Sequence, residues 1–324
     1  MLVEHTSEIP ARGANHAVIV GAGLGGLASA MRLGSKGWQV TVVDRLESAG
    51  GRGSSIIKDG HRFDLGPTIV TVPQVFEQLW AACGLDFHKD VDLRPLDPFY
   101  EIRWPDGSVF AARKKTEDML AEVRRLSPGD EKGYLRFLKD AHRRYVLGFE
   151  GMVAKPMHRA WETIKVLPEF ALLRADRSIL GLARARVKDE RLRMALSFHP
   201  LFIGGDPRKV TSMYALVSHL EKEYGVHYAV GGVAAMAQAM ENVVKGQGGQ
   251  IRYNTTADEI TFAGNKADGL KLDTGEVIPA DIVVSNADAG HTYDHLMRNR
   301  PKKRWTTKKL NRTKWSMGLF VWYF

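Results

Sequence analysis

The chain has 324 residues, 44% of them hydrophobic, which leaves room for two compact globular units. Its single cysteine excludes an internal disulfide, and its longest uncharged run, residues 17–31, is too short to span a bilayer. The formal net charge of +9 favours an anionic partner, and because no aromatic side chains alternate with the basic ones, we expect a lipid surface rather than nucleic acid. Residues 1–15 lack the apolar core of a signal peptide and are expected to be a disordered lead-in.

A glycine-rich turn close to the N-terminus predicts a dinucleotide-binding unit. Residues 17–20 are an apolar run that breaks at Gly21, Gly23 and Gly26 and continues as small residues, a pattern typical of strand, tight turn and helix. Gly21 allows the turn, Gly23 lets the backbone approach a pyrophosphate, and Gly26 lets the helix pack on the strand. The helix N-terminus then faces the phosphate charge. The predicted phosphate-binding residues are Gly21, Gly23, Leu24, Gly25 and Gly26.

A second apolar strand supports that interpretation. Residues 39–43 are followed by Asp44, at roughly the 20-residue spacing from the turn at which an acid binds the adenosine ribose. An ordinary glycine-rich turn without a ligand is the alternative, and an acid at this spacing argues against it.

Two segments after Asp44 resemble the FAD-binding start of the amine-oxidase-like flavoproteins. Residues 48–53 read Ser-Ala-Gly-Gly-Arg-Gly, and residues 61–68 read His-Arg-Phe-Asp-Leu-Gly-Pro-Thr. The resemblance implies FAD, because in that superfamily a Gly-Gly-Arg turn lies along the cofactor, whereas nicotinamide enzymes do not usually carry it. The Gly-Pro-Thr continuation is most similar to the bacterial-type phytoene desaturases, the carotenoid-forming dehydrogenases. Those enzymes often have Glu at the ribose position, and we expect Asp44, one methylene shorter, to keep the contact. The resemblance adds these cofactor contacts: Arg45, Gly51, Arg52, Gly66, Pro67 and Thr68.

The middle of the chain is expected to be mainly helical. Residues 73–84 predict a helix with proline at its start and glycine at its end, and residues 93–110 predict a hairpin. A helical pattern then extends over residues 116–193. We expect breaks in that pattern at residues 127–130, Pro156 and Pro168.

Residues 169–188 predict one amphipathic basic helix, because leucine and isoleucine fall on one face and arginine and lysine on the other. A surface helix with a solvated charged face and a helix docked on a membrane both remain open. His199 follows in an apolar run, where it is either a satisfied core residue or a catalytic group.

A return to the first domain is expected at Gly231 and Gly232, which open another helix. A strand, a hairpin and a final strand over residues 280–288 follow. The resemblance implies that this block rejoins the FAD-binding domain. It implies cofactor contacts at Ala257, Ser285 and Asn286.

The last residues combine a basic run with an apolar strand. Residues 302–314 are either a solvated loop or a contact for lipid headgroups. Residues 316–324 predict a strand apolar on both faces, which needs partner strands that the remaining sequence does not provide. We therefore expect a further C-terminal segment, and we expect the 324 residues alone to be poorly soluble, to bind FAD weakly and to show no desaturation.

The expected fold class is α/β, with a Rossmann-like FAD-binding domain of the amine-oxidase type and a discontinuous α+β substrate domain, truncated at its C-terminus. The FAD-binding domain is assigned to residues 16–84 and 226–290. The substrate and membrane-associated domain is assigned to residues 85–225 and 291–324.

The flavin is expected to carry the chemistry, since no metal-ligand cluster and no nucleophile elbow occurs in the sequence. The resemblance implies that hydride and a proton leave a phytoene-type C40 hydrocarbon. It places Glu162 where related desaturases carry an acid near the flavin, and a surface carboxylate is the alternative. A flavin amine oxidase with a polar substrate and a non-catalytic escort of lipidated partners remain open. We expect a cytoplasmic protein attached to the inner face of the cell membrane.

Overall fold

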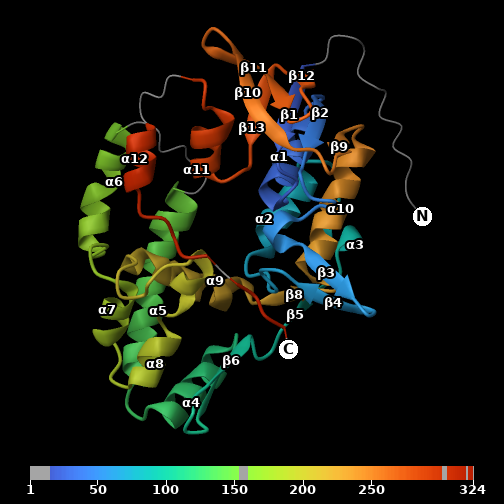
Figure 1. Ribbon diagram of the computed structural model, residues 1–324. Coiled ribbons are helices and arrows are strands. Elements are labelled where there is room, and N and C mark those ends of the chain that lie inside the picture. Colours follow the sequence, from blue (N-terminus) through green and yellow to red (C-terminus); the bar gives the residue numbers. More distant parts are fainter. Residues whose placement is uncertain (1–14, 153–159, 301–304, 319, 324) are drawn as a thin grey trace.

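A parallel sheet of four strands organises the half of the molecule that carries the glycine-rich turn (Figure 1). The computed structural model describes residues 15–152, 160–300, 305–318 and 320–323. The strand order is β13, β1, β2, β9, where β1 is His16–Val20, β2 is Gln39–Val43, β9 is Gln250–Arg252 and β13 is Ile282–Ser285. Val20 pairs with Val43 on one side and with Ser285 on the other, so these three strands end level at their carboxyl edge.

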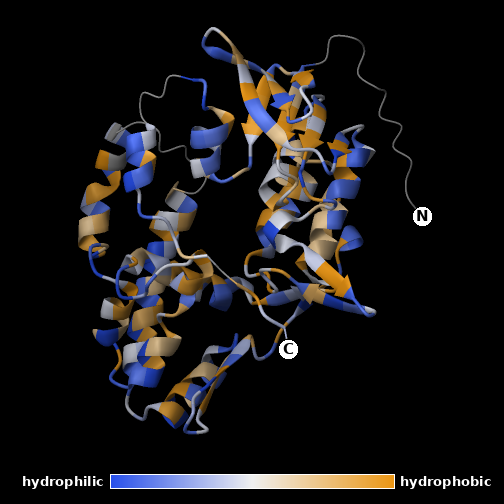
Figure 2. Ribbon diagram, in the orientation of Figure 1, coloured by the Kyte–Doolittle hydropathy of each residue, from blue (hydrophilic) through white to orange (hydrophobic). Residues whose placement is uncertain are grey.

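Helices cover one face of this sheet, and a small antiparallel sheet covers the other. Ile19 packs in the core formed with the helices, whereas Val18 and Val20 belong to the core on the opposite face. Because side chains alternate between the two faces of a strand, a strand buried on both faces is apolar throughout, as Figure 2 shows for this sheet. The helices are α1 (Leu24–Gly34), α2 (Pro73–Ala81) and α10 (Gly232–Gly246), and the antiparallel strands are β10 (Ala257–Ala263), β11 (Lys266–Leu272) and β12 (Val277–Pro279).

A third hydrophobic core lies in the other half, away from the parallel sheet in Figure 1. It joins the hairpin of β6 (Tyr100–Arg103) and β7 (Val109–Ala112) to a set of helices. Those helices are α4 (Thr116–Leu126), α5 (Glu131–Tyr145), α7 (Ile179–Arg184) and α8 (Glu190–Ala195). The two halves are tied by β5 (Leu93–Pro95), which pairs with β8 (His227–Ala229) although the two strands lie far apart in the sequence.

Short elements complete the described chain. In the first half these are η1 (Gly51–Gly53), β3 (Ser55–Lys58), β4 (His61–Asp64), α3 (Phe87–Asp90), α11 (Ala289–His291) and η5 (Thr292–Leu296). The others are η2 (Val146–Glu150), α6 (Ala160–Leu172), η3 (His199–Ile203), η4 (Ser212–Ala215), α9 (Leu216–Tyr224) and α12 (Thr307–Arg312).

Most of the predicted elements are confirmed. The structure contains the strand, turn and helix that begin at residue 16, and the second strand. It also contains the helix within residues 73–84, the hairpin, and the helix opened by Gly231 and Gly232. The predicted break at residues 127–130 separates α4 from α5. Pro156 lies outside the described residues.

The predicted continuous helix over residues 169–188 is wrong. Helix α6 ends at Leu172, and Arg174 has a φ of 51°, in the left-handed region. A residue in that conformation stops a helix, because its Cβ crowds the following carbonyl oxygen. A new helix, α7, then begins after Ser178, whose hydroxyl accepts a hydrogen bond from the Gly181 N–H. The leucine-rich face and the basic face therefore do not belong to one helix.

Two further expectations are wrong. Pro168 does not end a helix but lies inside α6, close to its C-terminal end, where the missing N–H removes only one hydrogen bond. The strand predicted over residues 316–324 does not form in its described part, residues 316–318 and 320–323. A strand exists only when another strand pairs with its backbone, and among the described residues none pairs with this segment. Phe320 is 87% exposed as a result.

Candidate functional site

The glycine-rich turn connects β1 to α1 in the geometry that an anion needs. Gly21 has a φ of 97°, and its N–H donates to the Val43 carbonyl oxygen over 2.8 Å. A Cβ on Gly26 would overlap the Gly21 carbonyl oxygen, so only glycine lets α1 start this close to β1. The first turn of α1 has no acidic residue, and its N-cap, Gly23, has no side chain to bond the free N–H groups. Those N–H groups and the helix dipole therefore favour a phosphate.

Asn286 forms the wall opposite this turn. Its N–H donates to the Val20 carbonyl oxygen over 2.8 Å, which holds it at the carboxyl end of the sheet. The side-chain oxygen of Asn286 lies 2.6 Å from the position that a Cβ on Gly25 would take, and its side-chain nitrogen lies 3.1 Å from that position on Gly23. A larger residue at either glycine would therefore fill the space between the turn and the amide.

Asp44 closes the turn from the second strand. Its side chain is buried, with Oδ2 accepting from the Ala22 N–H over 2.6 Å and Oδ1 from the Leu46 N–H over 2.8 Å. Each oxygen keeps a further lone pair for a ligand hydroxyl. The Asp44 carbonyl oxygen accepts from the Thr255 N–H over 2.9 Å, which places the segment before Ala257 beside this acid.

The Gly-Gly-Arg segment packs directly on the glycine-rich turn. Gly50 donates its N–H to the Ala22 carbonyl oxygen over 2.9 Å, and a Cβ on Gly51 would lie 3.3 Å from the Gly23 Cα. A Cβ on Gly66 would overlap the Arg52 carbonyl oxygen. Three segments that are separate in the sequence therefore meet at one place with backbone against backbone.

Each of the other predicted cofactor residues lies within two residues of one already described. Leu24 is half-buried against the core between the parallel sheet and its helices. Ser285 pairs with Val20 in the sheet, and its hydroxyl lies 2.7 Å from that of Thr292. Ala257 begins β10. The exposed residues of the set are Arg45, Arg52, Pro67 and Thr68. Their contacts with a cofactor stay a prediction.

Glu162 does not lie near the glycine-rich turn. It lies near the start of α6, which Figure 1 shows on the opposite side of the molecule from α1 and the parallel sheet. Its predicted catalytic role stays a prediction.

Asp64 is a residue that the sequence reasoning did not select. Its carboxylate lies where a Cβ on Gly232 would be, at the start of α10, and Gly232 has a φ of 77°. Burial raises the pKa of Asp64, against the opposing charge of Arg62. The sequence does contain a signal for Asp64, because this residue belongs to the same segment as Gly66, Pro67 and Thr68.

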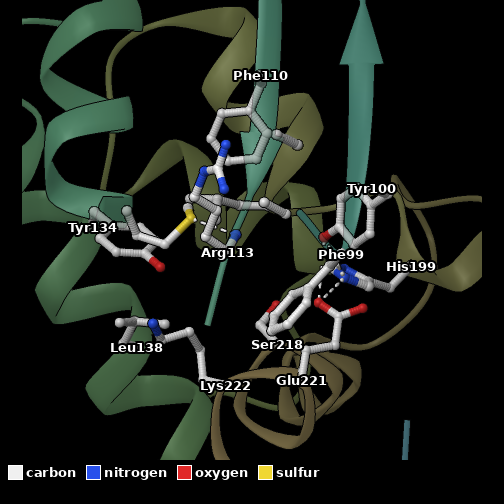
Figure 3. A pocket seen from close by; sticks show the side chains of 14 residues that line it. Phe99, Tyr100, Phe110, Arg113, Tyr134, Leu138, His199, Ser218, Glu221 and Lys222 are labelled. Carbon is white, nitrogen blue, oxygen red and sulfur yellow. Dashed lines mark hydrogen bonds and ion pairs between the residues drawn. The ribbon is translucent and has the colours of Figure 1, made fainter. Parts of the chain in front are cut away.

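A second polar cluster lies in the other core (Figure 3). His199 and Glu221 are almost fully buried, with His199 Nε2 3.1 Å from Glu221 Oε2. The Tyr100 hydroxyl donates to the same Glu221 oxygen over 3.3 Å. Burial, followed by the charge of Glu221, raises the pKa of Tyr100 well above its usual value. These residues line a cavity of about 30 Å³ together with aromatic side chains such as Phe110 and Tyr134.

The described residues contain neither a metal-ligand cluster nor a membrane-spanning helix. No group of three or more His, Cys, Asp or Glu side chains there could hold a metal ion. None of the helices described is long and apolar enough to cross a membrane.

Comparison with known proteins gives consistent matches. The sequence matches the family described as flavin containing amine oxidoreductase over residues 24–321. It is 63% identical over 315 residues to the phytoene desaturase (neurosporene-forming) of Cereibacter sphaeroides, covering 97% of this chain and 61% of that protein. The desaturase of the same description from Rhodobacter capsulatus is 60% identical over 313 residues, covering 96% of this chain and 60% of that protein. The chain therefore spans about 60% of the length of these curated relatives.

A solved structure shares the fold. The crystal structure of a Pyrococcus furiosus protein matches with a TM-score of 0.65 at 16% identity, covering 92% of this chain and 65% of that one. At that identity the likeness shows the fold alone.

Proposed function

Because the chain belongs to the flavin-containing amine oxidoreductase family, we propose that it acts as an FAD-dependent desaturase that removes hydride and a proton from phytoene-type C40 hydrocarbons in carotenoid biosynthesis. The predicted fold class, an amine-oxidase-like FAD-binding fold, is confirmed by the family match and by the fold comparison. The observation that carries the proposed activity is the 63% identity to a neurosporene-forming phytoene desaturase over 97% of this chain.

FAD, the cofactor predicted from the sequence, is confirmed by the match to the flavin-containing family and by the similarity to phytoene desaturases. The residues present fit the nucleotide end of FAD. Gly23 and Gly25 have no Cβ, which leaves the space between the turn and the Asn286 amide that a larger residue would fill. Gly23 and the first N–H groups of α1 would hold the pyrophosphate, and Asp44 would accept from the ribose. When bound, the flavin supplies the hydride-accepting chemistry.

A hydrocarbon offers no polar group, so the chain must position it by shape and provide a route for the proton. We propose Glu162 as the acid or base at the ring end of FAD, away from the nucleotide end beside α1, on the strength of its position in the sequence relative to Pro156. The names of the relatives support neurosporene as the product.

Flavin content tests the cofactor site. We expect Gly23→Val and Asp44→Ala to lower the flavin absorbance of the purified protein, the first because its side chain enters the phosphate space beside Asn286, the second because the acceptor is lost. The matched control is Gly246→Val, since nothing lies within 4 Å of a Cβ there. Full flavin absorbance in Gly23→Val would place the cofactor elsewhere.

Product analysis tests the activity. The full-length FAD-loaded enzyme, incubated with phytoene in liposomes, should form neurosporene, identified by chromatography. A Glu162→Gln variant should retain FAD and lose most of the product, since an amide cannot exchange the proton. Equal product from the variant would remove Glu162 from the mechanism, and the absence of any desaturated product from the wild-type enzyme would contradict the proposed function.

We also propose attachment to the anionic inner face of the cell membrane. The support is the net charge of +9 and an apolar stripe on α6, where Trp161, Ile164 and Leu167 are 47%, 61% and 53% exposed at helical spacing. The Lys165 ammonium group lies 4.2 Å from the centre of the Trp161 ring and adds positive charge beside this stripe. A bilayer also holds the apolar substrate.

Co-sedimentation with anionic liposomes tests this attachment. Binding should weaken as salt rises, because exposed charges are screened, and Ile164→Ser should weaken it further. Ile57→Ser, at a side chain that is 65% exposed on β3, is the control. Binding that ignores both salt and lipid charge would rule the attachment out.

A further inference from the structure

The 3-10 turn η3 carries an exposed apolar ridge, defined by Leu201, Phe202 and Ile203. These three consecutive side chains are 52%, 55% and 54% exposed. Large apolar side chains gathered at the surface mark a binding surface more often than a structural one.

The ridge is rigidly mounted, so its exposure does not come from a loose loop. His199, the first residue of η3, is anchored by its contact with Glu221 in the buried cluster of Figure 3. At the other end Gly204 has a φ of 66°, and the Gly205 N–H donates to the Pro200 carbonyl oxygen over 2.9 Å. A binding surface on a fixed backbone loses little conformational entropy when a ligand arrives.

The ridge is connected to the predicted flavin segment by the last described residues. A Cβ on Gly204 would lie 3.0 Å from the carbonyl oxygen of Met317, whose side chain is 59% exposed. Six residues later the Tyr323 ring packs on Phe63 at 5.0 Å, and its hydroxyl donates to the Asp64 carbonyl oxygen. Figure 1 shows this segment running from the second half of the molecule to the first. Asp64 directly precedes the segment that holds Gly66, Pro67 and Thr68.

The chemistry of the ridge selects an uncharged apolar ligand. Residues 200–205 contain no charged side chain. The next charged residue, Asp206, pairs with Arg208 at 3.0 Å and lies 4.0 Å from Lys209. Dispersion contacts and area burial are the only attractions that such a surface offers.

We propose that the ridge of η3 is a contact surface for the hydrocarbon substrate, and that residues 316–318 and 320–323 continue this surface to the flavin. The inference rests on the proposed desaturase function. It assigns Leu201 and Phe202 as residues that determine substrate affinity rather than as parts of the FAD site. The same ridge would then hold the end of the chain that is remote from the reacting carbons.

The test uses the full-length FAD-loaded enzyme in detergent micelles, with Leu201→Ala, Phe202→Ala and Phe202→Leu. The matched control is Leu135→Ala, whose side chain is 44% exposed on α5. Two quantities are measured: KM and kcat for phytoene, and the binding of the coloured polyene neurosporene by quenching of tryptophan fluorescence. The alanine variants should raise KM and the dissociation constant about tenfold, with flavin content and kcat little changed. Phe202→Leu should recover most of the affinity, and Leu135→Ala should match the wild type.

Two results would overturn the inference. One is an unchanged KM and polyene affinity in both alanine variants. The other is a loss of liposome binding with no change in micelles, which would make the ridge a lipid contact. A wild-type enzyme that binds neurosporene but desaturates nothing would count against the proposed function alone, and the quenching titration would still decide the role of the ridge.

Discussion

At the scale of a single residue, Gly26 shows how little space the cofactor turn leaves. A Cβ there would overlap the Gly21 carbonyl oxygen, a backbone atom that cannot move without separating α1 from β1. We expect Gly26→Ala to lower the free energy of unfolding by about 3 kcal/mol, toward the upper end for single substitutions. It should also lower FAD retention, because the helix N-terminus shifts away from the phosphates. Urea unfolding and flavin absorbance measure the two effects.

The control at this scale is Gly246→Ala, at the end of α10. Nothing lies within 4 Å of a Cβ there, and its φ is not in the left-handed region. Alanine is the better helix former, so this change should raise stability by roughly 0.5–1 kcal/mol. Equal stability of the two variants would contradict the steric argument.

At the scale of elements, α5 and α9 meet through two histidines. His142 Nδ1 lies 3.3 Å from His219 Nε2. Burial, followed by the charge of His142, lowers the pKa of His219 below its ordinary 6.5, although Glu150 and Glu223 oppose this. A histidine whose folded pKa is lowered contributes its full stability above pH 6.5 and loses it as pH falls from 6.5 to the folded pKa, since the unfolded state binds the proton more readily.

His142→Gln tests that coupling. The variant should raise the pKa of His219 toward 6.5, because one of the two causes of the shift is removed. The substitution should also reduce the stability that the protein loses between pH 7.5 and a pH near the folded pKa of His219. NMR titration of the His219 ring measures the pKa, and urea unfolding at two pH values measures the stability. A His219 titration that is identical in both proteins would show that His142 has no influence.

At the scale of the whole molecule, the core between the parallel sheet and its helices and the core of the other half are joined at the pairing of β5 with β8. The predicted phosphate- and ribose-binding residues lie in the half built on the parallel sheet, so FAD should stabilise that half most. At a free FAD concentration about one hundredfold above the dissociation constant, the gain for the bound state is about 2.7 kcal/mol. Hydrogen exchange should therefore slow most in β1, α1, β2 and β13, and less in α4 and α5. Stronger protection from hydrogen exchange in α4 and α5 than in β1 and α1 would indicate that FAD binds the other half of the molecule.

Local sequence patterns were sufficient to predict the glycine-rich turn, the second strand with Asp44 and the helix opened by Gly231 and Gly232. These features depend on backbone sterics and side-chain periodicity within a few residues, and such rules act before distant segments meet. The predicted cofactor contacts beyond Asp44, including Asn286, rest on a family resemblance, because no local pattern links residue 286 to Gly25.

Which residues far apart in the sequence lie together follows from the tertiary packing. The contact of His199 with Glu221 and the pairing of β5 with β8 join segments whose local patterns say nothing of each other. Periodicity over residues 169–188 favoured one helix, yet Arg174 adopts a φ of 51° there and the chain turns. The face on which each segment is buried is decided by what the rest of the chain packs against it, and helical spacing alone does not contain that information.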